Sequence, residues 1–94
     1  MDFSRPFQID AEVSFQKLEE ATVIVHLGTG RIHHTNNTGS RIWELLDQGR
    51  SPGEIVVRLE GEFDGPPARL RQEVETFLEQ LAAEKMIHQS GGGE

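Results

Sequence analysis

The chain has 94 residues, no cysteine and a formal net charge of −7, with 35% hydrophobic and 27% charged residues. This length predicts one small domain, and the lack of cysteine excludes disulfides, thiolate metal sites and cysteine catalysis. No apolar run approaches the length of a membrane span and no signal peptide is recognisable, so we expect a cytoplasmic protein without a membrane partner.

The negative charge is concentrated in the second half of the chain. Residues 1–50 carry a net charge of −2 and residues 51–94 carry −5, which together give the total of −7. A surface of this kind repels phosphate backbones and favours a basic or neutral partner. We therefore expect no nucleic-acid partner.

The first third of the chain predicts β-structure. Val13 and Phe15 alternate with polar neighbours, and the segment Thr22–Leu27 is β-branched and long enough for a buried strand. Glycines in Gly28–Gly30 supply the positive φ angles of a tight hairpin. A third strand should therefore run over Arg31–Thr35. In a three-stranded meander this strand is an edge, with one row of backbone N–H and C=O groups unpaired.

The next segment predicts two short helices. Asn37 or Thr38 can cap the first helix, which should end at Gly49. The stretch Ser51–Glu54 is a capping box with proline at the first helical position, and it predicts the start of the second helix. Gly61 should end that helix. The first helix is expected to bury Ile42, Trp43, Leu45 and Leu46, with the tryptophan as a core anchor.

A third helix should begin at Pro66 and Pro67. Its large apolar residues recur at helical spacing and form one continuous stripe. Met86 and Ile87 then suggest a short final strand. The stripe consists of Leu70, Val74, Phe77, Leu78 and Leu81.

These elements predict an α+β fold with winged helix-turn-helix architecture, in which an N-terminal three-stranded antiparallel sheet is followed by three helices. We assign residues 1–89 to this single domain and expect residues 90–94, which are mostly glycine, to form a disordered tail.

The sequence offers no signature of catalysis. It contains no nucleophile–base pattern, no paired carboxylates in an apolar pocket and no cofactor fingerprint, so we expect neither an enzyme nor a bound cofactor. His33 and His34 are adjacent on a predicted strand and should point to opposite faces. They therefore cannot bind one metal jointly, and we expect no metal site. One of the two could hydrogen-bond a bound peptide.

Several segments, taken in order, resemble the pattern of PqqD-like proteins. This family comprises the RiPP recognition elements, which include the stand-alone B1 proteins of lasso-peptide clusters. The matching segments are Gly30-x-Ile32, Asn36-x-Thr38-Gly39-x-x-Ile42-Trp43-x-Leu45-Leu46-Asp47, Ser51-x-x-Glu54-Ile55, Phe63-Asp64 and Val74-x-x-Phe77-Leu78-x-x-Leu81.

The resemblance implies a non-catalytic adaptor that binds the leader segment of a ribosomally made precursor peptide. The leader would add as a strand to the third β-strand, in a groove against the third helix. The adaptor would present the peptide to a partner maturation enzyme, a cysteine-protease-like leader peptidase in lasso-peptide pathways. The implied peptide-binding residues are Arg31, Ile32, His33, His34, Thr35, Leu70, Glu73, Val74 and Phe77, of which Glu73 could pair with a basic leader residue.

Three positions depart from the family pattern. Thr35 stands where the family usually has leucine, and Ile32 stands where it usually has an aromatic residue. Lys85 occupies a position where glycine commonly ends the third helix. Because two of these changes lie in the docking strand, the leader's side chains cannot be inferred from the family.

Three other functions are compatible with this pattern. The first is a PqqD-type chaperone for the precursor of a quinone cofactor, which would work with a radical enzyme. The second is a winged-helix DNA-binding protein, which the acidic helical half and the single arginine of the segment 28–31 disfavour. The third is a structural subunit of a larger synthetase.

Overall fold

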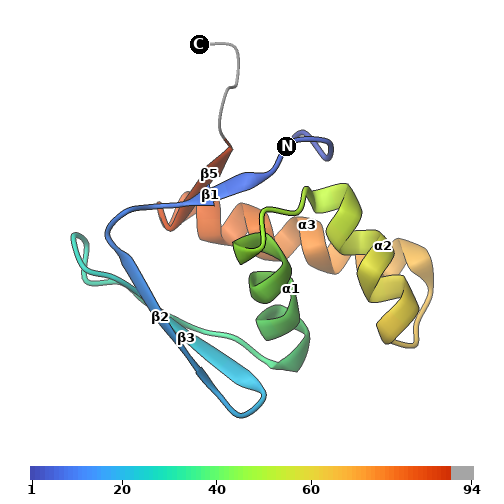
Figure 1. Cartoon of the computed structure of the whole chain (residues 1–94), viewed down its shortest axis with the longest axis horizontal. Helices are drawn as coiled ribbons and strands as arrows, with labels where there is room; N and C mark the ends of the chain where they lie inside the picture. Colours follow the sequence, from blue (N-terminus) through green and yellow to red (C-terminus); the bar gives the residue numbers. More distant parts are fainter. Residues whose placement is uncertain (90–94) are drawn as a thin grey trace.

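The computed structural model describes residues 1–89 as two antiparallel sheets and three helices (Figure 1). The expected α+β fold and its order, a three-stranded sheet followed by three helices, are confirmed, and the arrangement is consistent with a winged helix-turn-helix. The predicted tail 90–94 lies outside the described residues. The elements are β1 (Phe7–Ile9), β2 (Val13–Leu18), β3 (Ala21–His26), β4 (Ile32–His34), α1 (Asn37–Asp47), α2 (Pro52–Glu62), α3 (Pro67–Ala83) and β5 (Ile87–Gln89).

The larger sheet has the strand order β2-β3-β4, so β4 is an edge strand as expected. The smaller sheet pairs β1 with β5 and joins the two ends of the described chain, beside α3 (Figure 1). Strand β1 was not predicted, because three residues are too few to show a period of two. The short final strand suggested by Met86 and Ile87 is observed as β5.

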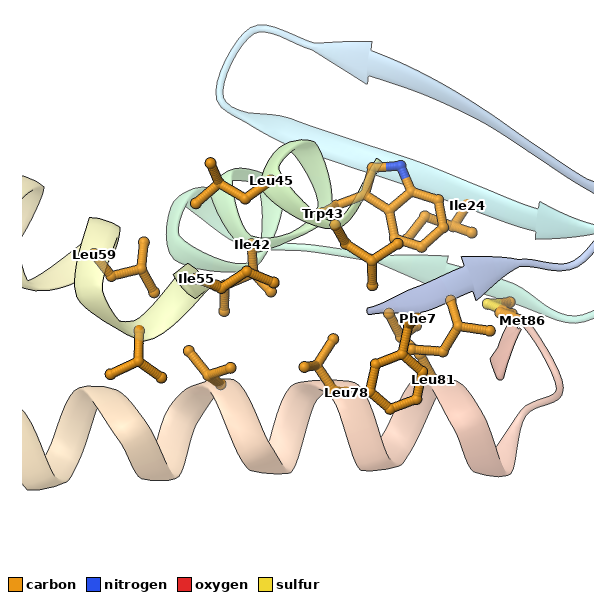
Figure 2. Packing of buried hydrophobic residues seen from close by; sticks show 14 residues of the cluster. Phe7, Ile24, Ile42, Trp43, Leu45, Ile55, Leu59, Leu78, Leu81 and Met86 are labelled. Atoms are coloured by element: carbon orange, nitrogen blue, oxygen red, sulfur yellow. The ribbon is translucent and has the colours of Figure 1, made fainter. Parts of the chain in front are cut away.

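The core lies between the three helices and the inner face of β3 (Figure 2). Trp43, on α1, is 1% exposed and is therefore a core residue, as expected. Phe15, on β2, contacts the indole ring edge-on, with 5.1 Å between ring centroids. Helix α3 turns one face inward, and its fully buried residues are Val74, Leu78 and Leu81. No helix in residues 1–89 is long and apolar enough to cross a membrane.

The start of α1 differs slightly from the expectation. Asn36, rather than Asn37 or Thr38, is the N-cap, and its Oδ1 accepts a hydrogen bond of 2.8 Å from the N–H of Gly39. Adjacent asparagines have the same capping chemistry, so the sequence alone does not distinguish them. The first helix ends before Gly49, which has a φ of +87°, as expected.

The capping box at the start of α2 is confirmed. The Ser51 hydroxyl accepts a hydrogen bond from the N–H of Glu54, and the Glu54 carboxylate accepts one from the N–H of Ser51. The helix ends at Glu62 and not at Gly61, which is helical and exposed. A single glycine in a helix costs about 1 kcal/mol, which the packing of α2 is able to offset.

The end of α3 shows why a glycine is common there in similar proteins. Lys85 follows the helix with a φ of +63°, in the left-handed region. Its N–H donates to the carbonyl of Ala82, and the N–H of Met86 donates to the carbonyl of Leu81. Lys85 therefore adopts the left-handed conformation that glycine adopts at helix ends, and its side chain adds some backbone strain.

An ion-pair network joins β2, α1 and α2. The Arg41 guanidinium donates to both carboxylate oxygens of Glu62, each at 2.8 Å, and to Glu44 at 3.1 Å. Lys17 donates to the second oxygen of Glu44. These contacts lower the pKa of Glu62, mainly through Arg41, and that of Glu44, mainly through Lys17.

We predict that Glu62→Gln lowers the free energy of unfolding at neutral pH by about 0.2–1 kcal/mol, because the pair is partly exposed. The pKa of Glu62 is lowered in the folded state, so its contribution exists above the ordinary glutamate pKa and is lost as the pH falls through the folded value. Urea denaturation across this range measures the effect. The exposed Glu60→Gln is the matched control, and an equal effect of both changes would contradict the prediction.

Candidate functional site

The outer edge of β4 carries unpaired backbone groups. Strand β4 pairs with β3 in the register Val23↔His34, Ile24↔His33 and Val25↔Ile32. Beyond these pairs, the N–H of Thr35 donates to the carbonyl of Thr22 at 3.0 Å, and the N–H of His26 donates to the carbonyl of Arg31 at 2.9 Å.

Hydrogen-bonded pairs alternate along an antiparallel ladder. The C=O group of Arg31, both backbone groups of His33 and the N–H group of Thr35 therefore face β3, whereas the N–H of Arg31 donates to the Thr29 hydroxyl. Ile32 and His34 direct theirs away from the sheet. Among the described residues, no strand covers this edge.

The side chains of β4 alternate between two faces, as predicted for the two histidines. His33 points toward α3, where its ring lies 5.7 Å from that of Phe77 and its Nδ1 lies 3.4 Å from Oε1 of Glu84. Ile32 and His34 are exposed on the opposite face. Within residues 1–89 no group of three or more possible ligands is placed to hold a metal ion.

A groove runs beside this strand, between the start of α1 and α3. It contains a cavity of about 400 Å³ with a partly apolar floor, formed by Gly39, Ile42 and Phe77, and a polar rim. A Cβ atom at Gly39 would lie 3.1 Å from the Phe77 ring and 3.2 Å from Cβ of Thr35, so glycine allows α1 to approach both. The rim consists of Asn36, Thr38, Gln72, Glu73, Thr76 and Gln80.

The structure brings together only part of the predicted α3 surface. Glu73 and Phe77 line the cavity, as do Gln72, Thr76 and Gln80, which were not predicted. These three polar residues recur every fourth position beside the apolar stripe, and that spacing is the signal that could have identified them.

The two aliphatic residues expected at the margin of the groove lie elsewhere. Val74 is 0% exposed and belongs to the core. Leu70 is 5% exposed and lines only a smaller neighbouring cavity of about 240 Å³. Most apolar residues of the α3 stripe are covered by α1 and α2. The part of the stripe that is accessible to a ligand is therefore smaller than the sequence suggested.

Thr35, which replaces the leucine usual in similar proteins, is a buried polar link. Its Oγ1 accepts a hydrogen bond of 2.9 Å from the N–H of Thr22. The Thr22 hydroxyl lies 2.6 Å from that of Ser40, on α1. All three residues are buried, and together they attach the end of β4 to β3 and α1.

The charges around the groove are few and partly paired. Glu73 lies 3.4 Å from Arg69 in an exposed pair, which contributes roughly 0–1 kcal/mol. Glu84 is partly buried near His33, and its Oε1 has no hydrogen-bond donor in good geometry. Arg31 is exposed at the opposite end of the strand.

The comparisons with known proteins identify this architecture. The family described as Coenzyme PQQ synthesis protein D (PqqD) matches residues 21–87. The solved structure of TbiB1 in complex with the TbiA(beta) leader peptide is similar, with a TM-score of 0.81 and 29% identity, over 93% of this chain and 99% of that chain.

A second solved structure, of a lasso peptide synthetase B1 complexed with the leader peptide, has a TM-score of 0.79. At 20% identity, over 87% of this chain and 96% of that chain, it supports the fold alone. No curated protein matches the chain in sequence.

We predict that Thr35→Val lowers the free energy of unfolding by about 1–3 kcal/mol, because the shape is kept while the buried N–H of Thr22 loses its acceptor. Chemical denaturation measures this loss. Thr76→Val, an exposed position on α3, is the matched control. A loss at Thr35 no larger than the loss at Thr76 would show that the link does not hold β4.

Proposed function

The chain belongs to the PqqD family, and we propose that it is a non-catalytic adaptor for a ribosomally made precursor peptide. It binds the leader segment and presents the precursor to the maturation enzyme of a lasso-peptide pathway, a cysteine-protease-like leader peptidase. The observation that carries this proposal is the unpaired edge at Ile32 and His34 beside the α3 groove. The similar TbiB1 structure, which contains a leader peptide, supports it.

In the proposed binding mode the leader forms a fourth strand on the larger sheet. Its backbone hydrogen-bonds the N–H and C=O groups of Ile32 and His34. Alternate leader side chains then face α3, opposite His33 and Thr35. The one near Thr35 lies beside the cavity at Gly39, since the two residues approach closely.

The leader side chain opposite His33 would meet a different environment. Phe77 offers an aromatic surface there, next to the His33 ring. This position therefore favours an apolar or aromatic leader side chain.

The expected energetics assign most of the affinity to the groove. Each backbone hydrogen bond contributes about 0.5–1.5 kcal/mol net. A large apolar side chain that becomes fully buried contributes about 1.5–3 kcal/mol. Ordering a flexible leader costs free energy, which offsets much of the smaller contribution of the backbone hydrogen bonds. We therefore expect the strand edge to fix the register of the leader and the groove to supply most of the affinity.

A second candidate function is the chaperone of a quinone-cofactor precursor, which would work with a radical enzyme. The description of the matching family favours it. The binding surface would be the same, so the two candidates differ in which precursor is bound. Parallel titrations with leaders of the two precursor classes separate them.

The direct experiment is a fluorescence-anisotropy titration of the chain into a labelled leader from the precursor encoded beside its gene. The TbiA(beta) leader is a second probe, and a scrambled leader is the control. We expect saturable binding of at least one leader and none of the scrambled peptide. Failure to distinguish leaders from the scrambled control would contradict the proposal.

We predict that His34→Pro weakens leader binding more than His34→Ala. Both changes remove the same exposed side chain, but only proline removes the outward N–H. Proline is tolerated at a sheet edge when its nitrogen faces away from the neighbouring strand. The difference should be about tenfold in dissociation constant. Equal affinities of two folded variants would exclude the strand-addition mode.

We also predict that Thr76→Trp, which fills the cavity rim, reduces leader affinity more than Glu79→Trp on the same helix. Thr76 lines the groove cavity, whereas Glu79 lines a separate cavity near β5. Circular dichroism checks that both variants fold, and the anisotropy titration measures affinity. Similar affinities in the two variants would show that the cavity does not receive the leader.

A further inference from the structure

His26, at the end of β3, is a buried titratable residue with no part in the proposed function so far. It is 6% exposed. Its Nδ1 accepts hydrogen bonds of 3.1 Å from the N–H groups of both Gly28 and Thr29. Its Nε2 lies 3.5 Å from Oδ1 of Asp10. A nitrogen that accepts carries no proton, so this geometry assigns the neutral imidazole with its proton on Nε2.

The turn between β3 and β4 depends on this imidazole. The N–H of Leu27 donates to the carbonyl of Glu12, and the N–H of Gly30 donates to the carbonyl of His26, each at 2.8 Å. With the two bonds to Nδ1, these contacts fix every N–H from residue 27 to residue 30.

Gly28 is confined by the same cluster. A Cβ atom there would lie 2.1 Å from Oε1 of Glu12 and 3.1 Å from Cε1 of His26. The sequence suggested that both turn glycines supply positive φ angles. Gly30 has a φ of +79°, whereas the φ of Gly28 is not positive. At Gly28 the nearest atom belongs to the end of the flexible Glu12 side chain, which is able to move, so the remaining close contact is with the His26 ring.

We propose that His26 is a positioning residue for peptide binding, which through its neutral Nε2-protonated ring fixes the turn that delivers β4 to the edge of the sheet. Strand β4 begins at Ile32, two residues after this turn, and has only three residues. A displaced turn therefore moves the outward groups that the leader would bond. The proposal rests on the proposed leader binding.

Protonation of His26 would turn Nδ1 from an acceptor into a donor and remove both bonds to the turn. Oδ1 of Asp10 lies beside Nε2, and the N–H groups of Gly28 and Thr29 point at Nδ1. The Glu12 carboxylate and the His26 ring both lie close to Gly28. Arg31 is opposite His26, and its carbonyl accepts from the N–H of His26. Leader affinity should therefore fall as His26 takes up a proton.

The first test needs no ligand. In a nitrogen-15 spectrum of the wild-type protein at neutral pH, His26 should show a non-protonated Nδ1 and a protonated Nε2. The amides of Gly28 and Thr29 should exchange slowly with solvent. A protonated Nδ1, or exchange as fast as in an exposed loop, would overturn the proposal whether or not the leader binds.

The second test uses two substitutions at the same position. His26→Asn keeps an acceptor close to the place of Nδ1 but cannot take up a proton in this range. His26→Phe keeps an aromatic ring and loses the acceptor. We expect His26→Phe to weaken leader binding about tenfold, and His26→Asn to retain it with a weaker pH dependence than the wild type. His88→Phe, at an exposed position on β5, is the matched control.

Leader affinity of folded His26→Phe equal to that of His88→Phe would overturn the positioning role. Should His26→Phe fail to fold, an unchanged pH dependence of His26→Asn would overturn it instead. If no leader binds the wild-type protein, the proposed function fails, and the nitrogen spectrum still decides the protonation state of His26.

Discussion

The structure depends on holding a very short strand in place while one of its edges stays open. Within residues 1–89, strand β4 has three residues and pairs with one other strand, so its ladder alone supplies few hydrogen bonds. Buried polar side chains reinforce it at both ends. Thr35 is linked to Thr22 and through it to Ser40 at one end, and His26 accepts from the turn at the other. An edge held in this way is ordered before a ligand arrives, which lowers the entropy cost of binding.

Helix α3 serves the core and the groove with different faces. Val74, Leu78 and Leu81 are completely buried, while a polar row that includes Thr76 and Gln80 lines the cavity. Phe77 lies between the two faces and contacts His33 of β4. Such a division explains how a chain of 94 residues can build a core and still leave an open groove. It also means that changes on the polar row test function with little effect on stability.

The elements that could be predicted are those with a strong local signal. The capping box at Ser51, the apolar stripe of α3 and the hairpin strands follow from patterns within a few residues, and the structure confirms them. Strand β1 could not be predicted, because its partner β5 is distant in the sequence and both strands have three residues. The edge position of β4 was predictable, because the last strand of a meander has one neighbour.

The residues of the site were predictable only in part. Of the residues that the sequence proposed for the groove, Glu73 and Phe77 line the cavity and Val74 lies in the core. Apolar periodicity does not say which side of a stripe other helices cover. The roles of Thr35 and His26 depend on contacts between strands and turns that no local pattern encodes.

In the proposed binding mode, the outward N–H and C=O groups of β4 receive an extended peptide. Amide hydrogen exchange, measured residue by residue with and without the leader from the precursor encoded beside the gene, tests it most directly. We expect an alternating result, in which Ile32 and His34 become protected on binding while His33 and Thr35, whose N–H groups already face β3, change little. Leader binding that leaves Ile32 and His34 unprotected, or that protects all four residues equally, would contradict it.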